Sequence, residues 1–155
     1  MLPINFQNLP FHQTATGYVI NQDNTRMLLI LHKKLAKWLP AGGHIDENEM
    51  PHLAAQREVL EETGVIANFE SVNVLYTNSI ILPNPFATFL QIIDDPKGKH
   101  LHLDFAYKMI ADDTQKLLEN KLETNGINWF NLDQIQSLDV FPSVLEFAQD
   151  NLIKK

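Results

Sequence analysis

The chain has 155 residues, 45% of them hydrophobic, which is enough for one domain with a core. It contains no cysteine, which excludes disulfide bonds and thiolate zinc sites, and its net charge of −7 argues against binding of nucleic acid polymers. No apolar run approaches the length of about 20 residues that spans a membrane, and the start, MLPINFQNLPFHQ, does not resemble a signal peptide. We therefore expect a single cytoplasmic domain over residues 1–155.

Two β-rich runs come first along the chain. Residues 14–21 and 27–32 flank the polar turn NQDNT and predict a hairpin. A segment rich in lysine follows and ends at Gly42 and Gly43. Because glycine has no side chain, the backbone at this pair can approach a ligand closely.

An uninterrupted helix is predicted from Pro51 to Thr63. Pro51 suits the first helical position because its missing N–H would have no partner there, and Gly64 suits the left-handed residue that follows a helix end. Leu53 and Leu60 share one side of this helix, and we expect them to anchor it to the core.

Three glutamates share the opposite side of the same helix. At about 100° per residue, Glu58, Glu61 and Glu62 fall on one face, where like charges repel. Carboxylate oxygens are the ligands that Mg²⁺ or Mn²⁺ prefers, and such an ion would offset the repulsion. The alternative is a solvated acidic face. The glycine pair before the helix favours the metal site.

The remainder of the chain predicts further strands and two more helices. The expected strands are 67–77, 86–93, 101–111 and 127–130, and the expected helices are 132–138 and 143–153. Strands on both sides of a central helix, with a helix at the end, predict an α/β fold with a mixed sheet.

The window from Gly43 to Val65 resembles the signature of the Nudix hydrolases. Its fixed positions are all filled at the right spacing, by Gly43, Glu49, Arg57, Glu58, Val59, Glu61, Glu62, Gly64 and Val65. The resemblance implies the Nudix fold, an α/β/α sandwich with a catalytic loop-helix. It also implies metal-dependent hydrolysis of a small nucleoside diphosphate derivative, and it makes a homodimer plausible.

The resemblance also implies roles for individual residues. Glu58, Glu62 and Glu61 are the expected ligands of Mg²⁺ or Mn²⁺, joined by the backbone carbonyl of Gly42. Arg57 is expected to orient Glu58; the alternative is an ordinary ion pair on the helix surface. Glu49 either bridges the loop to the helix or is a solvated loop acid.

The general base is left open between three glutamates. The candidates are Glu58 itself, Glu119 and Glu123, of which Glu123 is our choice outside the signature. Other polar and aromatic residues also have two readings each. Each of them either lines the pocket or binds substrate, or is simply exposed or packed in the core. These residues are His44, His100, His102, Asp104, Lys33, Lys34, Lys37, Trp38 and Phe86.

The substrate is not decided by the signature. The additional markers of the ADP-ribose, diadenosine polyphosphate, NADH and coenzyme A subfamilies are absent or displaced, which leaves a nucleoside triphosphate or a nucleotide sugar as the leading classes. The alternative function is a Nudix-fold nucleotide-binding or regulatory domain without catalysis. That alternative is weakened because the acids of the signature are all present. A purely structural metal-binding domain is weaker still.

Overall fold

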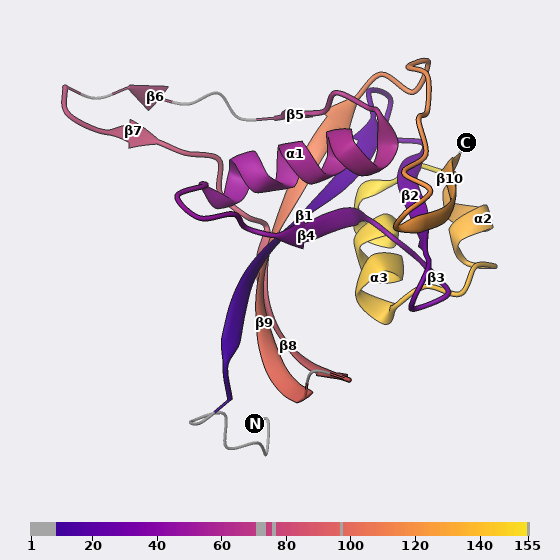
Figure 1. Cartoon of the computed structure of the whole chain (residues 1–155). Helices are drawn as coiled ribbons and strands as arrows, with labels where there is room; N and C mark the ends of the chain where they lie inside the picture. The colour runs from indigo at the N-terminus through magenta and orange to yellow at the C-terminus, as the bar shows by residue number, and fades with distance from the viewer. Residues whose placement is uncertain (1–8, 71–73, 76, 97, 155) are drawn as a thin grey trace.

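The computed structural model describes residues 9–70, 74–75, 77–96 and 98–154. Within them, eight strands form one sheet, and two short strands, β6 (Val74–Leu75) and β7 (Ile80–Ile81), pair separately (Figure 1). The eight strands are β1 (Phe11–Asn21), β2 (Met27–His32), β3 (Lys37–Leu39), β4 (Ala41–His44), β5 (Asn68–Phe69), β8 (Ala87–Asp95), β9 (Gly98–Ala111) and β10 (Thr124–Phe130). The helices are α1 (Pro51–Thr63), α2 (Leu132–Ile135) and α3 (Pro142–Asn151).

The sheet is mixed, as predicted. Its order is β10-β2-β1-β9-β5, with β3 on β2, β4 on β1 and β8 on β9. The central pair β1 and β9 is parallel over its whole length, from Phe11 opposite Leu101 to Asn21 opposite Ala111, and the other pairs are antiparallel. The predicted hairpin of β1 and β2 is present.

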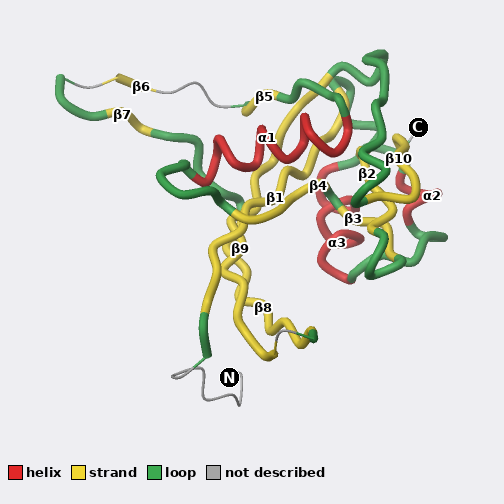
Figure 2. Tube along the Cα trace, in the orientation of Figure 1, coloured by secondary structure: helices red, strands yellow, loops and turns green. Residues whose placement is uncertain are grey.

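Helices cover both faces of the sheet, which confirms the predicted α/β/α sandwich (Figures 1 and 2). Helix α1 packs one face through Ala54, Ala55 and Val59, while α3 packs the other through Val144, Phe147 and Ala148. The approach of α1 to β1 is close. A Cβ on Gly17 would lie 2.4 Å from Val59 Cγ2, so the strand needs glycine there.

The ends of α1 agree with the prediction from its capping residues. Pro51 is the first helical residue, and Gly64 has a φ of 72° and donates its N–H to the carbonyl of Leu60. The expected anchors were wrong, however. Leu53 and Leu60 are 47% and 49% exposed, whereas Glu58 and Glu62 are buried. The small residues and the carboxylates face the sheet, so the leucines lie on the outside.

Some boundaries also differ from the prediction. The expected strand 67–77 is interrupted, with β5 and β6 at its described parts, while residues 71–73 and 76 lie outside the described residues. Helix α2 ends at Ile135, three residues before the expected end, and the short strands β3, β4 and β7 were not predicted. The N-terminal segment assessed for a signal peptide lies largely outside the described residues, at 1–8. Among the described helices, none is long and apolar enough to cross a membrane.

Candidate metal and phosphate site

The site is built where strand β4 passes beneath helix α1. A Cβ on Gly43 would lie 2.5 Å from Glu58 Oε1, and a Cβ on Gly42 would lie 2.7 Å from Thr16 Oγ1 and 2.8 Å from the carbonyl oxygen of Ala15. Position 42 therefore requires glycine, because backbone atoms would clash with a side chain there, whereas a side chain at position 43 would displace the carboxylate of Glu58. The pair lets the strand lie directly against the carboxylates of the helix.

The three expected metal-binding glutamates are not equivalent in the structure. Glu58 is 9% exposed and Glu62 only 2%, while the side chain of Glu61 is 55% exposed. The backbone N–H of Gly42 donates to Glu62 Oε2 at 3.0 Å, so the loop and the most buried carboxylate are in direct contact. A solvated acidic face does not describe Glu58 and Glu62, because both are turned toward the sheet.

Arg57 connects the loop to the helix. It donates Nε to Glu49 Oε1 and Nη2 to Glu49 Oε2, both at 2.9 Å, and Nη1 to Glu58 Oε1 at 2.7 Å. The same guanidinium reaches Glu61 Oε2 at 3.2 Å and the carbonyl oxygen of His44 at 2.9 Å. Glu49 bridges loop and helix, as one of its two readings expected, since it also accepts the N–H of Asp46.

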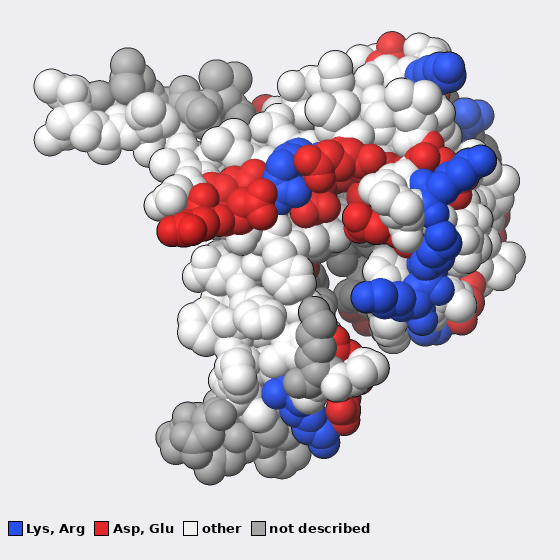
Figure 3. Space-filling view, viewed as in Figure 1, with Lys and Arg blue, Asp and Glu red and all other residues white. Residues whose placement is uncertain are grey.

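The electrostatics of the site favour a cation. Burial, together with the charges of Glu58, Glu123 and Glu61, raises the pKa of Glu62 to about 8, although the N–H of Gly42 opposes this. Burial also raises the pKa of Glu58, against the lowering effect of Arg57. Figure 3 shows acidic side chains in a band along the loop and α1, with basic side chains farther along the same face. A divalent ion with oxygen ligands fits this donor set and would supply the missing charge.

The raised pKa of Glu62 predicts the pH dependence of stability in the metal-free protein. A carboxyl group whose pKa is 4.5 when unfolded and about 8 when folded stabilises the fold at low pH, and this contribution is lost as the pH rises toward 8. Compared with Glu62→Gln, the wild type should gain up to roughly 1.4 kcal/mol per pH unit in its free energy of unfolding as the pH falls from 8 to 5. Urea unfolding of both proteins in chelator measures this, and parallel profiles would contradict it.

Glu123 lies near the carboxylate pair. Its charge contributes to the raised pKa of both Glu58 and Glu62. The segment that carries it crosses the end of α1, where Leu118 donates its N–H to the carbonyl of Thr63 at 2.9 Å. The other candidate, Glu119, instead accepts a long hydrogen bond from Thr124 Oγ1 at 3.5 Å.

Most of the remaining candidates lie elsewhere or are engaged by the protein. Lys33 donates to the carbonyl oxygen of Lys121, and Lys37 pairs with Asp139. Trp38 packs edge-on against Phe130 at 4.7 Å between ring centroids and against the core, which supports core packing for Trp38. Phe86 contacts the rings of Tyr18 and Phe147 but is 45% exposed, so it lies at the edge of the core. Lys34 is exposed.

The histidines and Asp104 form a separate polar group. Asp104 is buried in mid-strand and accepts hydroxyl hydrogen bonds from Thr14 at 2.9 Å and Thr16 at 2.8 Å. His44 and His102 contact each other through their rings. The sequence reasoning missed Thr14, Thr16 and His12. Alternation along residues 12–16 could have placed these three side chains on one face of a strand. Their partners on β9, however, depend on parallel pairing that the sequence did not predict.

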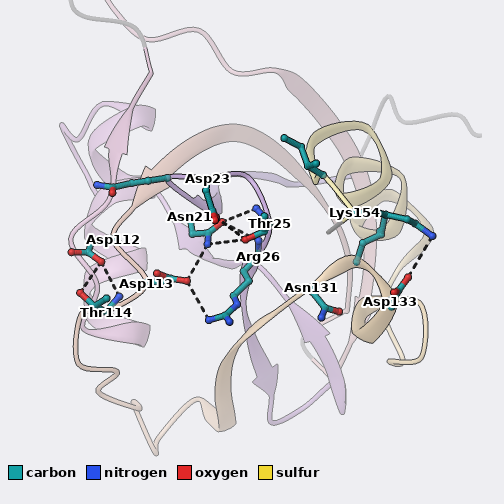
Figure 4. A pocket seen from close by; sticks show the side chains of 13 residues that line it. Asn21, Asp23, Thr25, Arg26, Asp112, Asp113, Thr114, Asn131, Asp133 and Lys154 are labelled. Atoms are coloured by element: carbon teal, nitrogen blue, oxygen red, sulfur yellow. Dashed lines mark hydrogen bonds and ion pairs between the residues drawn. The ribbon is translucent and has the colours of Figure 1, made fainter.

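A hollow of about 640 Å³ lies away from all of these residues (Figure 4). Its charges are largely paired with one another: Arg26 with Asp113 at 3.3 Å and Lys154 with Asp133 at 3.4 Å. None of the residues that line it is a candidate site residue, so we do not assign the site to this hollow.

Comparison with known proteins identifies the architecture. Residues 11–150 match the model of the NUDIX domain. An RNA pyrophosphohydrolase of Bartonella henselae is 38% identical over 71 residues, which cover 40% of each chain. The chain spans less than half the length of the curated relatives it matches.

Solved structures give the same result. A hydrolase of the NUDIX family from Clostridium perfringens superposes with a TM-score of 0.72 at 27% identity, over 90% of this chain and 95% of that one. The NUDIX domain of Shewanella oneidensis NrtR, solved with ADP ribose, superposes with a TM-score of 0.61 at 16% identity, over 89% and 84%. The second likeness is one of fold alone.

Proposed function

This chain belongs to the NUDIX family, and on that premise we propose that it hydrolyses a diphosphate linkage in a nucleoside diphosphate derivative, by attack of water at phosphorus. The observation that carries the proposal is the buried pair Glu58 and Glu62 against the glycines of β4, where Glu62 accepts the N–H of Gly42 at 3.0 Å. A divalent ion would offset the charge of both carboxylates in their ionised form, and it would also offset the charge of a bound diphosphate.

The residues that would hold Mg²⁺ or Mn²⁺ are Glu58, Glu62 and Glu61, with the carbonyl of Gly42. When bound, the ion would supply positive charge that stabilises the charge developing on the phosphoryl oxygens. Arg57 holds Glu58 and Glu49 in place, so the geometry of the carboxylates is set before substrate arrives. Glu123 is the proposed base, which takes the proton of the attacking water.

The leading substrates are a nucleoside triphosphate and a nucleotide sugar. Support for a small substrate comes from the net charge of −7, which opposes binding of a polyanionic chain. We further infer that residues 1–155 act as one domain, since the family model covers residues 11–150. The absence of cysteine supports a location in the cytoplasm. A homodimer is the form to test by light scattering.

The first prediction concerns substrate and metal together. Incubation with a panel of nucleoside triphosphates, nucleotide sugars and dinucleoside polyphosphates should release phosphate or pyrophosphate products with Mg²⁺ or Mn²⁺, and excess chelator should abolish the reaction. The physical reason is that water cannot attack a highly charged diphosphate at a useful rate without compensating positive charge. Full turnover in chelator would contradict the metal requirement. No turnover on any substrate, with nucleotide binding retained, would favour the alternative of a non-catalytic binding or regulatory domain.

A second prediction isolates Arg57. Arg57→Ala should keep the fold and lower kcat by roughly tenfold to a hundredfold, because Glu58 and Glu49 lose the group that orients them. The matched control is Arg26→Ala, since Arg26 is also in an ion pair, with Asp113, but lies away from the site. Steady-state kinetics and circular dichroism of both variants provide the measurement. Equal rates for the two variants would indicate that Arg57 forms only an ordinary surface ion pair.

A further inference from the structure

Four of the histidines gather on the face of the sheet opposite α1. Gly43 faces Glu58 on α1, so the next residue of β4, His44, points to the other face. His12 on β1 lies opposite His102 on β9 in parallel register, and His44 pairs next to them, opposite Thr14. The register of three paired strands therefore brings these side chains to one place.

The rings of this group contact one another closely. A ring nitrogen of each of His12, His44 and His102 lies within 4.8 Å of those of the other two. Ring centroids are 5.3 Å apart for His12 and His44, and 5.0 Å apart for His44 and His102. His100 adjoins the group, with its Nε2 at 3.2 Å from Nε2 of His102.

The group is open to solvent on one side. His12 and His44 are exposed, and His102 is half-buried. A shallow hollow of about 480 Å³ adjoins them, lined by Phe11, His12, Gln13, His44 and Ile45. An ion can therefore reach the rings without displacing core residues.

We propose that His12, His44 and His102 form a three-histidine site for a borderline transition metal ion, with Zn²⁺ the best-fitting ion. Imidazole nitrogen suits zinc, copper and nickel, whereas Mg²⁺ prefers the oxygens of the carboxylate site. Three histidines with a water in the fourth position form a common zinc environment. Zinc at about 2.0–2.1 Å from each nitrogen requires the nitrogens to lie roughly 3.3 Å apart, which rotation of the two exposed rings can reach.

The surroundings of His102 suit a metal ligand. Burial and the neighbouring His44, His100 and His12 lower the pKa of His102 to about 4. Its ring is therefore neutral at neutral pH, and the metal ion does not have to compete with a proton for it.

The site is linked to the loop of the carboxylate site through one residue. The His44 ring belongs to the histidine group, while its carbonyl oxygen accepts Arg57 Nη2 at 2.9 Å. Zinc bound to the ring would hold the end of β4 in place and, with it, this acceptor of Arg57. The bound ion should accordingly raise the melting temperature of the protein by several degrees.

The direct test is a zinc titration followed at each imidazole. The full chain, free of any affinity tag, is kept in excess Mg²⁺ so that the carboxylate site is occupied. Long-range ¹⁵N–¹H spectra at one equivalent of Zn²⁺ should show shifted ring resonances for His12, His44 and His102, with His32 and His52 unchanged. Unshifted rings in the first three, at one equivalent, would overturn the proposal. This measurement needs no variant.

Variants then separate the two metal sites. His102→Gln and His44→Gln should weaken Zn²⁺ binding at least tenfold by calorimetry in excess Mg²⁺, while the control His32→Gln, on β2, should bind as the wild type does. Glu62→Gln should also retain Zn²⁺ binding, because it alters only the carboxylate site. If instead Glu62→Gln loses zinc and the histidine variants keep it, the ion binds at the glutamates and the three-histidine site is wrong.

Discussion

Glu62→Gln is expected to lower the rate of hydrolysis by orders of magnitude without weakening the metal-free fold. Glutamine keeps the size of the side chain and its oxygen can still accept the N–H of Gly42, which lies 3.0 Å from Glu62 Oε2. What it removes is one negative charge at a 2% exposed position beside Glu58. Because the charge assistance of the metal amounts to several kcal/mol in the transition state, its loss acts on kcat.

Melting temperature and turnover together distinguish a metal-binding role of Glu62 from a purely structural one. Melting temperature with and without Mg²⁺ or Mn²⁺ should show a smaller metal-induced gain in the variant, since that gain follows metal affinity. Glu146→Gln, an exposed glutamate on α3, is the matched control and should behave as wild type in both assays. Turnover of Glu62→Gln at the wild-type rate would overturn the assignment of α1 as the metal platform.

Glu123→Gln is expected to reduce kcat by roughly 10²- to 10⁴-fold, the range that a general base contributes. The charge of Glu123 acts on both Glu58 and Glu62, so the group lies near the carboxylate pair, where we propose that it accepts a proton from the attacking water. If Glu123 is the base, as proposed, its loss should lower kcat far more than it changes KM, because the proton moves only during reaction. The rise of the wild-type rate with pH that reports a base should be lost in the variant.

Glu119→Gln is the control for this prediction. Glu119 lies in the same segment, but within the described part of the chain its carboxylate accepts only the long hydrogen bond from Thr124. Its substitution should leave the pH profile of kcat unchanged. If Glu123→Gln and Glu119→Gln both retain full activity, the base is within the signature, with Glu58 as the remaining candidate. Metal affinity should be measured in parallel. A lower rate at unchanged metal affinity indicates lost proton transfer, whereas a lower rate with weaker metal binding indicates that Glu123 acts through its negative charge.

The sequence alone was sufficient for the loop-helix and for the fold class. Helix α1 begins at Pro51 and ends before Gly64, as predicted, because capping depends on local backbone geometry and on missing side chains or N–H groups. The spacing of Glu58, Glu61 and Glu62 along the helix likewise places them on one face, which is a local property of helix geometry. These features depend only on residues close together in the sequence, so they can be predicted without knowing which distant segments pack against the helix.

Only the tertiary structure decided which side of that helix is buried. Leu53 and Leu60 are exposed and Glu58 and Glu62 are buried, the reverse of what hydrophobicity predicts. The side of a helix that faces a sheet depends on what the sheet presents, and here the glycines of β4 leave room for carboxylates. Small residues such as Ala54 and Ala55 then provide the packing.

The neighbours of the site were likewise decided by long-range pairing. The parallel register of β1 with β9 brings Thr14 to Asp104 and His12 to His102, residues 90 positions apart in the chain. Alternation within each strand predicts which residues share a face, but it carries no information about the strand beside it. The carboxylates of the candidate metal-binding helix could therefore be predicted from the sequence, while the histidine group and the proximity of Glu123 depend on how the strands and the loop assemble around it.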